Sequence, residues 1–236
     1  MANAPGNATA RRLRRPLFML LGLIGALWGS ALAAPQLLAF PYRTDIGSTT
    51  VYSETPIRAG DMRRVLARSD ALLQKTGFTG PAGTRLFLTR GGWRWKMLAL
   101  NSRGAFAVTR PVSAIVSDAV LVNRADPATD GVFNRPAIDS CRRHLSGVIA
   151  HERTHIQMNR AIGYIRTAML PQWQREGYAD YVAEESGLTP QEYARLKRAG
   201  ASHPAIVYYE GRKRIEALAA QKGGTIAALF GADKDR

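Results

Sequence analysis

Two histidines in the second half of the chain have the spacing of a metal-binding pair. His151 and His155 are four residues apart in the run His-Glu-Arg-Thr-His. Four residues of an α-helix turn roughly 400°, so the two imidazoles would lie about 40° apart on one face and could share one cation. The adjacent Glu152 cannot reach the same point as a third ligand, but it can reach a water molecule beside the cation and act as a general base. The pattern therefore predicts metal-assisted hydrolysis.

Two carboxylates downstream extend this pattern. Glu176 follows His155 by 21 residues, which is enough chain for one helix to end, a loop to reverse and a second helix to return. Catalytic zinc takes three protein ligands, and two histidines with one glutamate are a known set. Asp180 lies one turn after Glu176 on the same face, where it could accept the free N–H of a ligating histidine. We expect a Zn²⁺ site made by His151, His155 and Glu176, with Asp180 behind it.

The segment 145–182 resembles the gluzincin superfamily of zinc metallopeptidases. The similarity is carried by the HExxH pattern at 151–155 and by the W-x-x-E-G-x-A run at 173–179. The resemblance implies the same zinc ligands, Glu152 as the residue that activates water, and Asp180 as the acid behind the ligands. It also implies a peptidase in which an edge strand, for which 104–109 is the candidate, aligns the substrate backbone. The G-x-M-E-N motif of the aminopeptidases is absent, so the resemblance does not extend to an aminopeptidase.

Other side chains with suitable chemistry are few. His203, Tyr208 and Tyr209 could each donate a hydrogen bond to the oxyanion of a hydrolysis reaction, although a solvated loop position is the simpler interpretation of His203. His144 is expected at the start of the histidine helix rather than at the metal. Cys141 is the single cysteine, so no intramolecular disulfide can form, and a structural thiol is expected because no second cysteine lies at ligand spacing.

The elements that must position these residues divide the chain into two parts. Strands are expected at 49–52, 85–89, 105–109 and 119–122, with a helix at 61–75. Helices are expected at 142–160, 173–186, 189–200 and 205–221, the third beginning with a capping box at Thr189. Strands followed by helices predict an α+β domain. In it, a small mixed or antiparallel sheet of the N-terminal half packs on a helical C-terminal half that carries the HExxH helix.

The first 34 residues have the character of an export segment. Four arginines between residues 11 and 15 precede an uncharged run of 18 residues, 17–34, which ends in small residues. This order is typical of a signal peptide, with cleavage expected after Ala33. The same run is just long enough for a membrane anchor with a cytoplasmic basic end. Either alternative places 35–236, expected to be a single metallopeptidase-like domain, outside the cytoplasm, periplasmic or secreted, or anchored to the inner membrane by 17–34.

Composition restricts the classes of partner. The chain has 236 residues, of which 46% are apolar and 22% charged, a balance that fits one globular domain. The formal net charge of +15 comes mainly from arginine, which is spread along the chain without a nucleic-acid-binding motif. We therefore expect a protein or peptide substrate and no specific nucleic-acid binding. The charge also leaves open a second function, a metal-stabilised binding or regulatory module at a membrane surface that has no proteolytic activity.

Overall fold

A five-stranded sheet forms the core of the N-terminal half, in a computed structural model that describes residues 7–80, 83–109, 118–133 and 142–231. The strands are β1 (Tyr42–Ile46), β2 (Thr49–Ser53), β3 (Arg85–Leu88), β4 (Ala107–Thr109) and β5 (Ala119–Val122). Their order is β1-β2-β3-β5-β4. The strands β2, β3 and β5 run parallel, and β1 and β4 are antiparallel to their neighbours. The predicted sheet is confirmed and is mixed.

Alternate residues of the central strands supply two different cores. Leu86 and Leu88 belong to a core with the helices α2 (Ala59–Leu73) and α5 (Leu145–Ile162), whereas Phe87 packs with α3 (Trp93–Ala99). Side chains of a strand alternate between its two faces, so a strand covered on both faces is apolar at every position. On the α3 face, Phe87 stacks on Tyr52 with ring centroids 4.8 Å apart.

A small three-stranded sheet leads into the helix that carries the histidines. Its antiparallel strands are β6 (Ala125–Asp126), β7 (Gly131–Phe133) and β8 (Arg142–His144), and α5 begins at the next residue. The expected helix start at 142 is therefore three residues too early, because 142–144 pair as a strand. Asp130 accepts hydrogen bonds from the backbone N–H and the hydroxyl of Ser146, both at 2.7 Å. A carboxylate at a helix N-terminus satisfies a free N–H and is stabilised by the helix dipole.

The C-terminal half is helical, which confirms the predicted α+β class. After α5 come α6 (Tyr164–Met169), α7 (Gln172–Ala183), α8 (Pro190–Arg198), α9 (Pro204–Lys222) and α10 (Ile226–Phe230). The predicted capping box is present, since the Thr189 side chain accepts from the Glu192 N–H and the Glu192 side chain from the Thr189 N–H. Helices α7 and α9 meet at Gly177 and Gly211, where a β-carbon on Gly211 would lie 2.4 Å from the carbonyl oxygen of Trp173. Glycine is required for this approach of two backbones.

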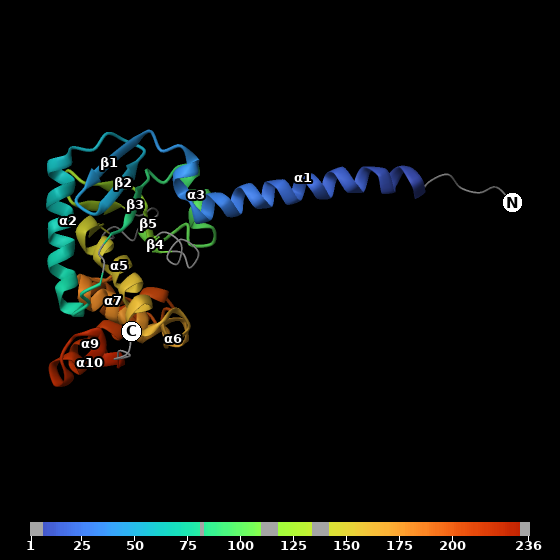
Figure 1. Cartoon of the computed structure of the whole chain (residues 1–236). Coiled ribbons are helices and arrows are strands. Elements are labelled where there is room, and N and C mark those ends of the chain that lie inside the picture. Colours follow the sequence, from blue (N-terminus) through green and yellow to red (C-terminus); the bar gives the residue numbers. More distant parts are fainter. Residues whose placement is uncertain (1–6, 81–82, 110–117, 134–141, 232–236) are drawn as a thin grey trace.

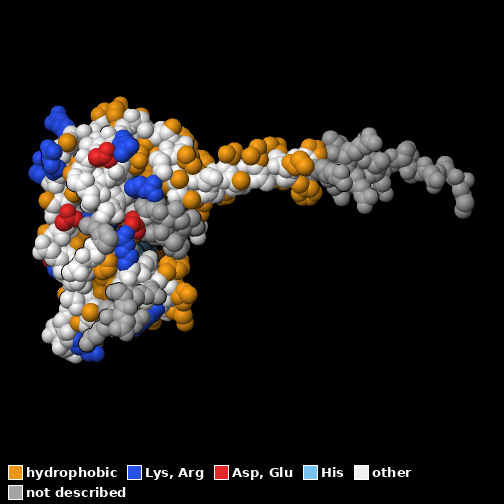
Figure 2. All heavy atoms as spheres, viewed as in Figure 1, with side chains coloured by type: hydrophobic (Ala, Val, Ile, Leu, Met, Phe, Trp, Pro, Cys, Tyr) orange, Lys and Arg blue, Asp and Glu red, His pale blue; other side chains and the backbone are white. Residues whose placement is uncertain are grey.

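The N-terminal helix α1 (Asn7–Ala33) projects away from the rest of the molecule (Figure 1). Its large apolar side chains from Phe18 to Trp28 are exposed and give it the hydrophobic surface seen in Figure 2. A 3₁₀ turn at Pro35–Leu38 connects α1 to β1. Within the described ranges, no helix has both the length and the apolar character that crossing a membrane requires.

Candidate metal centre

Helices α5 and α7 bring three metal-ligating side chains to one point. His151 and His155 extend from α5, and Glu176 extends from α7. The Nε2 atoms of the two histidines are 3.3 Å apart, and each lies 3.4 Å from Oε2 of Glu176. The three donor atoms therefore form a nearly equilateral triangle. The structure places together the three residues that the sequence predicts as ligands.

The size of this triangle fits a small tetrahedral cation. With ligand bonds of about 2.0–2.1 Å, two ligands of a tetrahedral zinc ion lie about 3.3–3.4 Å apart. The distances between the donor atoms are 3.3 and 3.4 Å. Two imidazole nitrogens and one carboxylate oxygen are also a donor set that zinc accepts. The residues present could hold such an ion.

Asp180 fixes the orientation of one of the histidines. It is fully buried, and the Nδ1–H of His151 donates to its Oδ1 over 2.8 Å, which leaves the Nε2 lone pair for a cation. Arg143 and the Ser186 hydroxyl also donate to Asp180. Burial by itself would raise the pKa of Asp180, but Arg143 and these hydrogen bonds outweigh it and lower the pKa. Nδ1 of His155, in contrast, is buried with no hydrogen-bond partner among the described residues.

The carboxylate oxygen of Glu176 that faces away from the histidines, Oε1, pairs with Arg175. Nε of Arg175 lies 3.1 Å from Oε1, so Oε2 is the oxygen that faces the histidines. Burial would raise the pKa of Glu176, but the charges and hydrogen bonds of His155 and His151 lower it. Burial would likewise lower the pKa of His151, but Asp180 and Glu176 raise it to about 10. In the metal-free protein, this pKa keeps a proton on His151, so a cation must displace a proton when it binds.

The three residues line a cleft with a volume of ≈ 910 Å³. Glu152 lines the same cleft, beside the first histidine of the triangle. Residues 104–109, which include the edge strand β4, form another part of the lining. The Thr109 hydroxyl donates to the Glu152 carbonyl oxygen over 3.4 Å and joins β4 to α5. The candidate substrate strand thus lies at the cleft, although only its last three residues pair as a strand.

Two hydrogen-bond donors on α9 or just before it also line the cleft. Burial and the charge of Glu176 raise the pKa of Tyr208 to about 12, so its hydroxyl keeps its proton at neutral pH. Nδ1 of His203 accepts from the Ala205 N–H over 3.2 Å, which places the proton of the neutral ring on Nε2. Tyr209 instead stacks on Tyr193 with ring centroids 4.4 Å apart, away from the cleft.

The remaining candidates have structural surroundings, or cannot be placed. His144 is the residue before α5, as expected, and its ring pairs with Glu185 over 3.1 Å. Cys141 lies outside the described residues. Sequence reasoning missed Arg143 and Arg175, the two cations that hold carboxylates of the site. Only Arg175 gives a sequence signal, because it is adjacent to Glu176.

Comparison with known proteins gives no match, whether to family models, to curated proteins or to solved structures. The geometry of the cleft therefore carries the functional argument.

Proposed function

We propose that this chain is a zinc-dependent hydrolase and, within that class, a peptidase. The observation that carries the proposal is the triangle of His151, His155 and Glu176 donors, which has the edge length of a tetrahedral zinc site and lines an open cleft. When bound, zinc would supply a Lewis acid that polarises a carbonyl group and lowers the pKa of water. The reaction class is thus metal-assisted hydrolysis.

Glu152 is the general base in this proposal. It is nine-tenths buried, follows His151 directly and lines the same cleft as the three donors. One of its carboxylate oxygens would accept a proton from the attacking water and later deliver that proton to the nitrogen of the leaving amine.

Tyr208 and His203 are the proposed oxyanion donors. The phenol of Tyr208 remains protonated because its pKa is raised to about 12. The Nε2–H of His203 is free to donate because Nδ1 already accepts from a backbone N–H. Both would donate to the oxygen of the substrate carbonyl as negative charge develops on it.

The edge strand β4 supports a peptide rather than another hydrolysable group. An edge strand presents unpaired backbone N–H and C=O groups, with which an extended peptide can pair. Apolar side chains of Phe106, Val108 and Leu188 line the cleft near this strand. We therefore propose proteins or peptides as substrates. The basic and apolar N-terminal segment supports a location of 35–236 outside the cytoplasm.

Substitution of the base tests the proposal most directly. Glu152→Gln should keep the zinc content of the native chain and lose cleavage of a casein-type substrate, on the order of 10²–10⁴-fold. Glu184→Gln is the matched control, because Glu184 is an exposed carboxylate that pairs with Lys75 instead of lining the cleft. Full turnover in Glu152→Gln would reject Glu152 as the base. A native chain that holds zinc but cleaves nothing would reject the peptidase and favour the membrane-surface module.

A further inference from the structure

The two rims of the metal cleft carry exposed apolar side chains that the proposed chemistry does not use. On α3, Trp93 and Met97 are 53% and 37% exposed, and on α6, Ile165 and Met169 are 75% and 79% exposed. The loop that follows α3 and other residues of α6 both line the cleft. These two patches, which we name the α3 rim and the α6 rim, therefore flank it.

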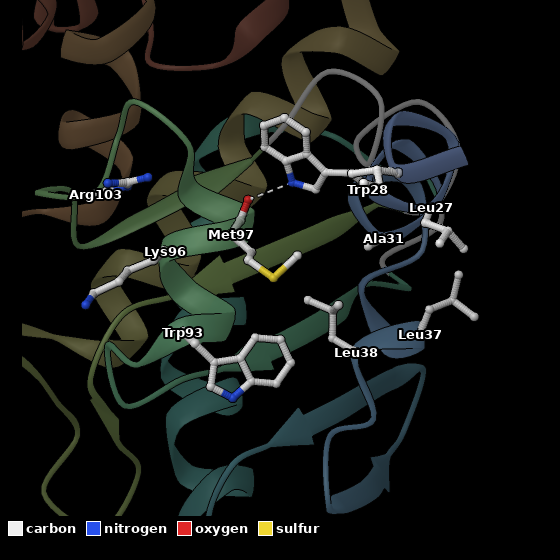
Figure 3. Close-up of a pocket in the computed structure, with 10 residues that line it drawn as sticks. Leu27, Trp28, Ala31, Leu37, Leu38, Trp93, Lys96, Met97 and Arg103 are labelled. Atoms are coloured by element: carbon white, nitrogen blue, oxygen red, sulfur yellow. Dashed lines mark hydrogen bonds between the residues drawn. The ribbon is translucent and has the colours of Figure 1, made fainter. Parts of the chain in front are cut away.

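The α3 rim continues into an apolar groove at the base of α1 (Figure 3). The groove has a volume of ≈ 850 Å³ and lies between α1, the 3₁₀ turn and α3. The indole N–H of Trp28 donates to the Met97 carbonyl oxygen over 3.4 Å across it. Its charged lining residues are Lys96 and Arg103, and no acidic residue is among the ten that line it.

Both rims lie on the side of the molecule from which α1 projects. Figure 1 shows α3 and α6 on this side and α2 on the opposite side. Figure 2 shows hydrophobic side chains along α1, at its base and again over the position of α6. An extended apolar surface with a polar border marks an interaction site rather than a water-facing surface. Here two apolar patches are separated by a cleft, an arrangement that suits a broad, flat partner.

We propose that the α3 and α6 rims rest on an anionic phospholipid bilayer. Indole rings favour the interface between headgroups and acyl chains, which suits Trp93. Lys96 and Arg103 can keep their stems on the apolar groove and their charges among lipid phosphates. Of the net charge of +15, the arginines at 11–15 account for four, so 35–236 still carries +11. A basic domain is attracted to a bilayer that contains anionic lipid.

Fluorescent labels on the full chain test this contact. A single environment-sensitive label is placed at Ile165→Cys or Trp93→Cys, with Cys141→Ser to remove the native thiol. Arg63→Cys on the opposite helix α2 is the matched control, because Arg63 is exposed there. The probe is a vesicle of equal parts phosphatidylcholine and phosphatidylglycerol. We expect a blue shift and several-fold brighter emission at both rim positions and no change at the control.

Helix α1 by itself could hold the chain on a vesicle, so vesicle binding alone does not show that the rims touch lipid. The readout is therefore the surroundings of the label at each rim position. A rim label that stays water-like on vesicle-bound chain overturns the proposal. A blue shift without vesicles that grows with protein concentration also overturns it, in favour of a second copy of the chain. The pair Ile165→Gln and Met169→Gln should weaken the shift at the Trp93→Cys label, and an unchanged midpoint of thermal unfolding shows that these variants fold. None of these readouts depends on proteolysis.

Discussion

Asp180 orients the ring of His151, one of the three ligands of the proposed zinc site. Asp180→Asn keeps the size of the side chain but removes the charge that faces His151 and Arg143. We expect zinc to bind about 10–100-fold more weakly, as for other partners of ligating histidines. Competition with a chromogenic chelator measures the affinity. Asp70→Asn is the control, because Asp70 pairs with α5 through Arg153 and not through a histidine. Equal affinities in the two variants would remove Asp180 from the site.

The pKa values of the site predict how stability depends on pH. The pKa of His151 is raised from 6.5 to about 10, so its contribution to stability is complete below pH 6.5 and is lost as the pH rises toward 10. The lowered pKa values of Glu176 and Asp180 contribute above their ordinary values of 4.5 and 3.8 and are lost as the pH falls. The contributions of His151, Glu176 and Asp180 to the stability of the metal-free protein are therefore all present between pH 4.5 and 6.5.

Thermal unfolding with and without a chelator checks this dependence. Zinc requires unprotonated histidines, so the stabilisation by zinc should increase as the pH rises. The chelated His151→Gln variant should lose the decline in stability above pH 6.5 that the chelated native chain shows. A decline of the same size in both proteins would show that other groups cause it.

At the scale of single residues, the sequence predicts the relative positions of side chains on one helix. It does not predict contacts between side chains that are far apart in the chain. The spacing of His151 and His155 places both rings on one face, because helix geometry is local. Arg143 lies 37 residues before Asp180, so their contact depends on how β8 packs against α7. No local pattern contains that information.

Among the elements, the crossing of α7 and α9 determines where Glu176 and Tyr208 lie. Gly211→Ala would place a methyl group 2.4 Å from the Trp173 carbonyl oxygen, a backbone atom that cannot rotate away. We expect a loss of about 1–3 kcal/mol in the free energy of unfolding from this overpacking. Because α9 would move from α7, zinc affinity should fall as well. Denaturant unfolding and zinc titration measure the two effects.

Gly60→Ala in α2 is the control for the glycine substitution. A β-carbon at Gly60 would have no atom within 4 Å. Alanine is the better helix former, so this variant should be as stable as the native chain or slightly more stable. A Gly211→Ala variant that behaves in the same way would show that the two helices separate without cost.

Long elements are predicted better than short ones. The helices over 145–162, 172–183 and 204–222 follow from apolar periodicity and caps, and the box at Thr189 is found in full. Helix α3 has seven residues, and the alternation of Trp93 and Trp95 hides it, although Trp95, Leu98 and Ala99 are buried at helical spacing. The strands β6 to β8 have two or three residues each and form through pairing with one another. Elements this short contain too few residues to show a periodic pattern in the sequence.

In the whole molecule, the cleft with the proposed zinc site lies where the sheet meets the helical half. Helix α5 contributes Val148, Ile149 and Ile156 to the core under the sheet, and Ala150 and Met158 to the helical core. The histidines are therefore carried by a helix that, like α2, belongs to both of these cores. Movement of either half would reach the three proposed zinc ligands through α5.

The proposed peptidase and the proposed bilayer contact together predict which substrates are cut fastest. A cleft flanked by two lipid-contacting rims would meet peptide segments that emerge next to the bilayer. A peptide tethered to phosphatidylglycerol-containing vesicles should therefore be cleaved several-fold faster than the same peptide in solution. The pair Ile165→Gln and Met169→Gln should abolish this preference and leave the rate on the free peptide unchanged, because neither residue lines the cleft. Equal rates on both peptides, with a rim label that reports lipid contact, would mean that the cleft opens away from the bilayer.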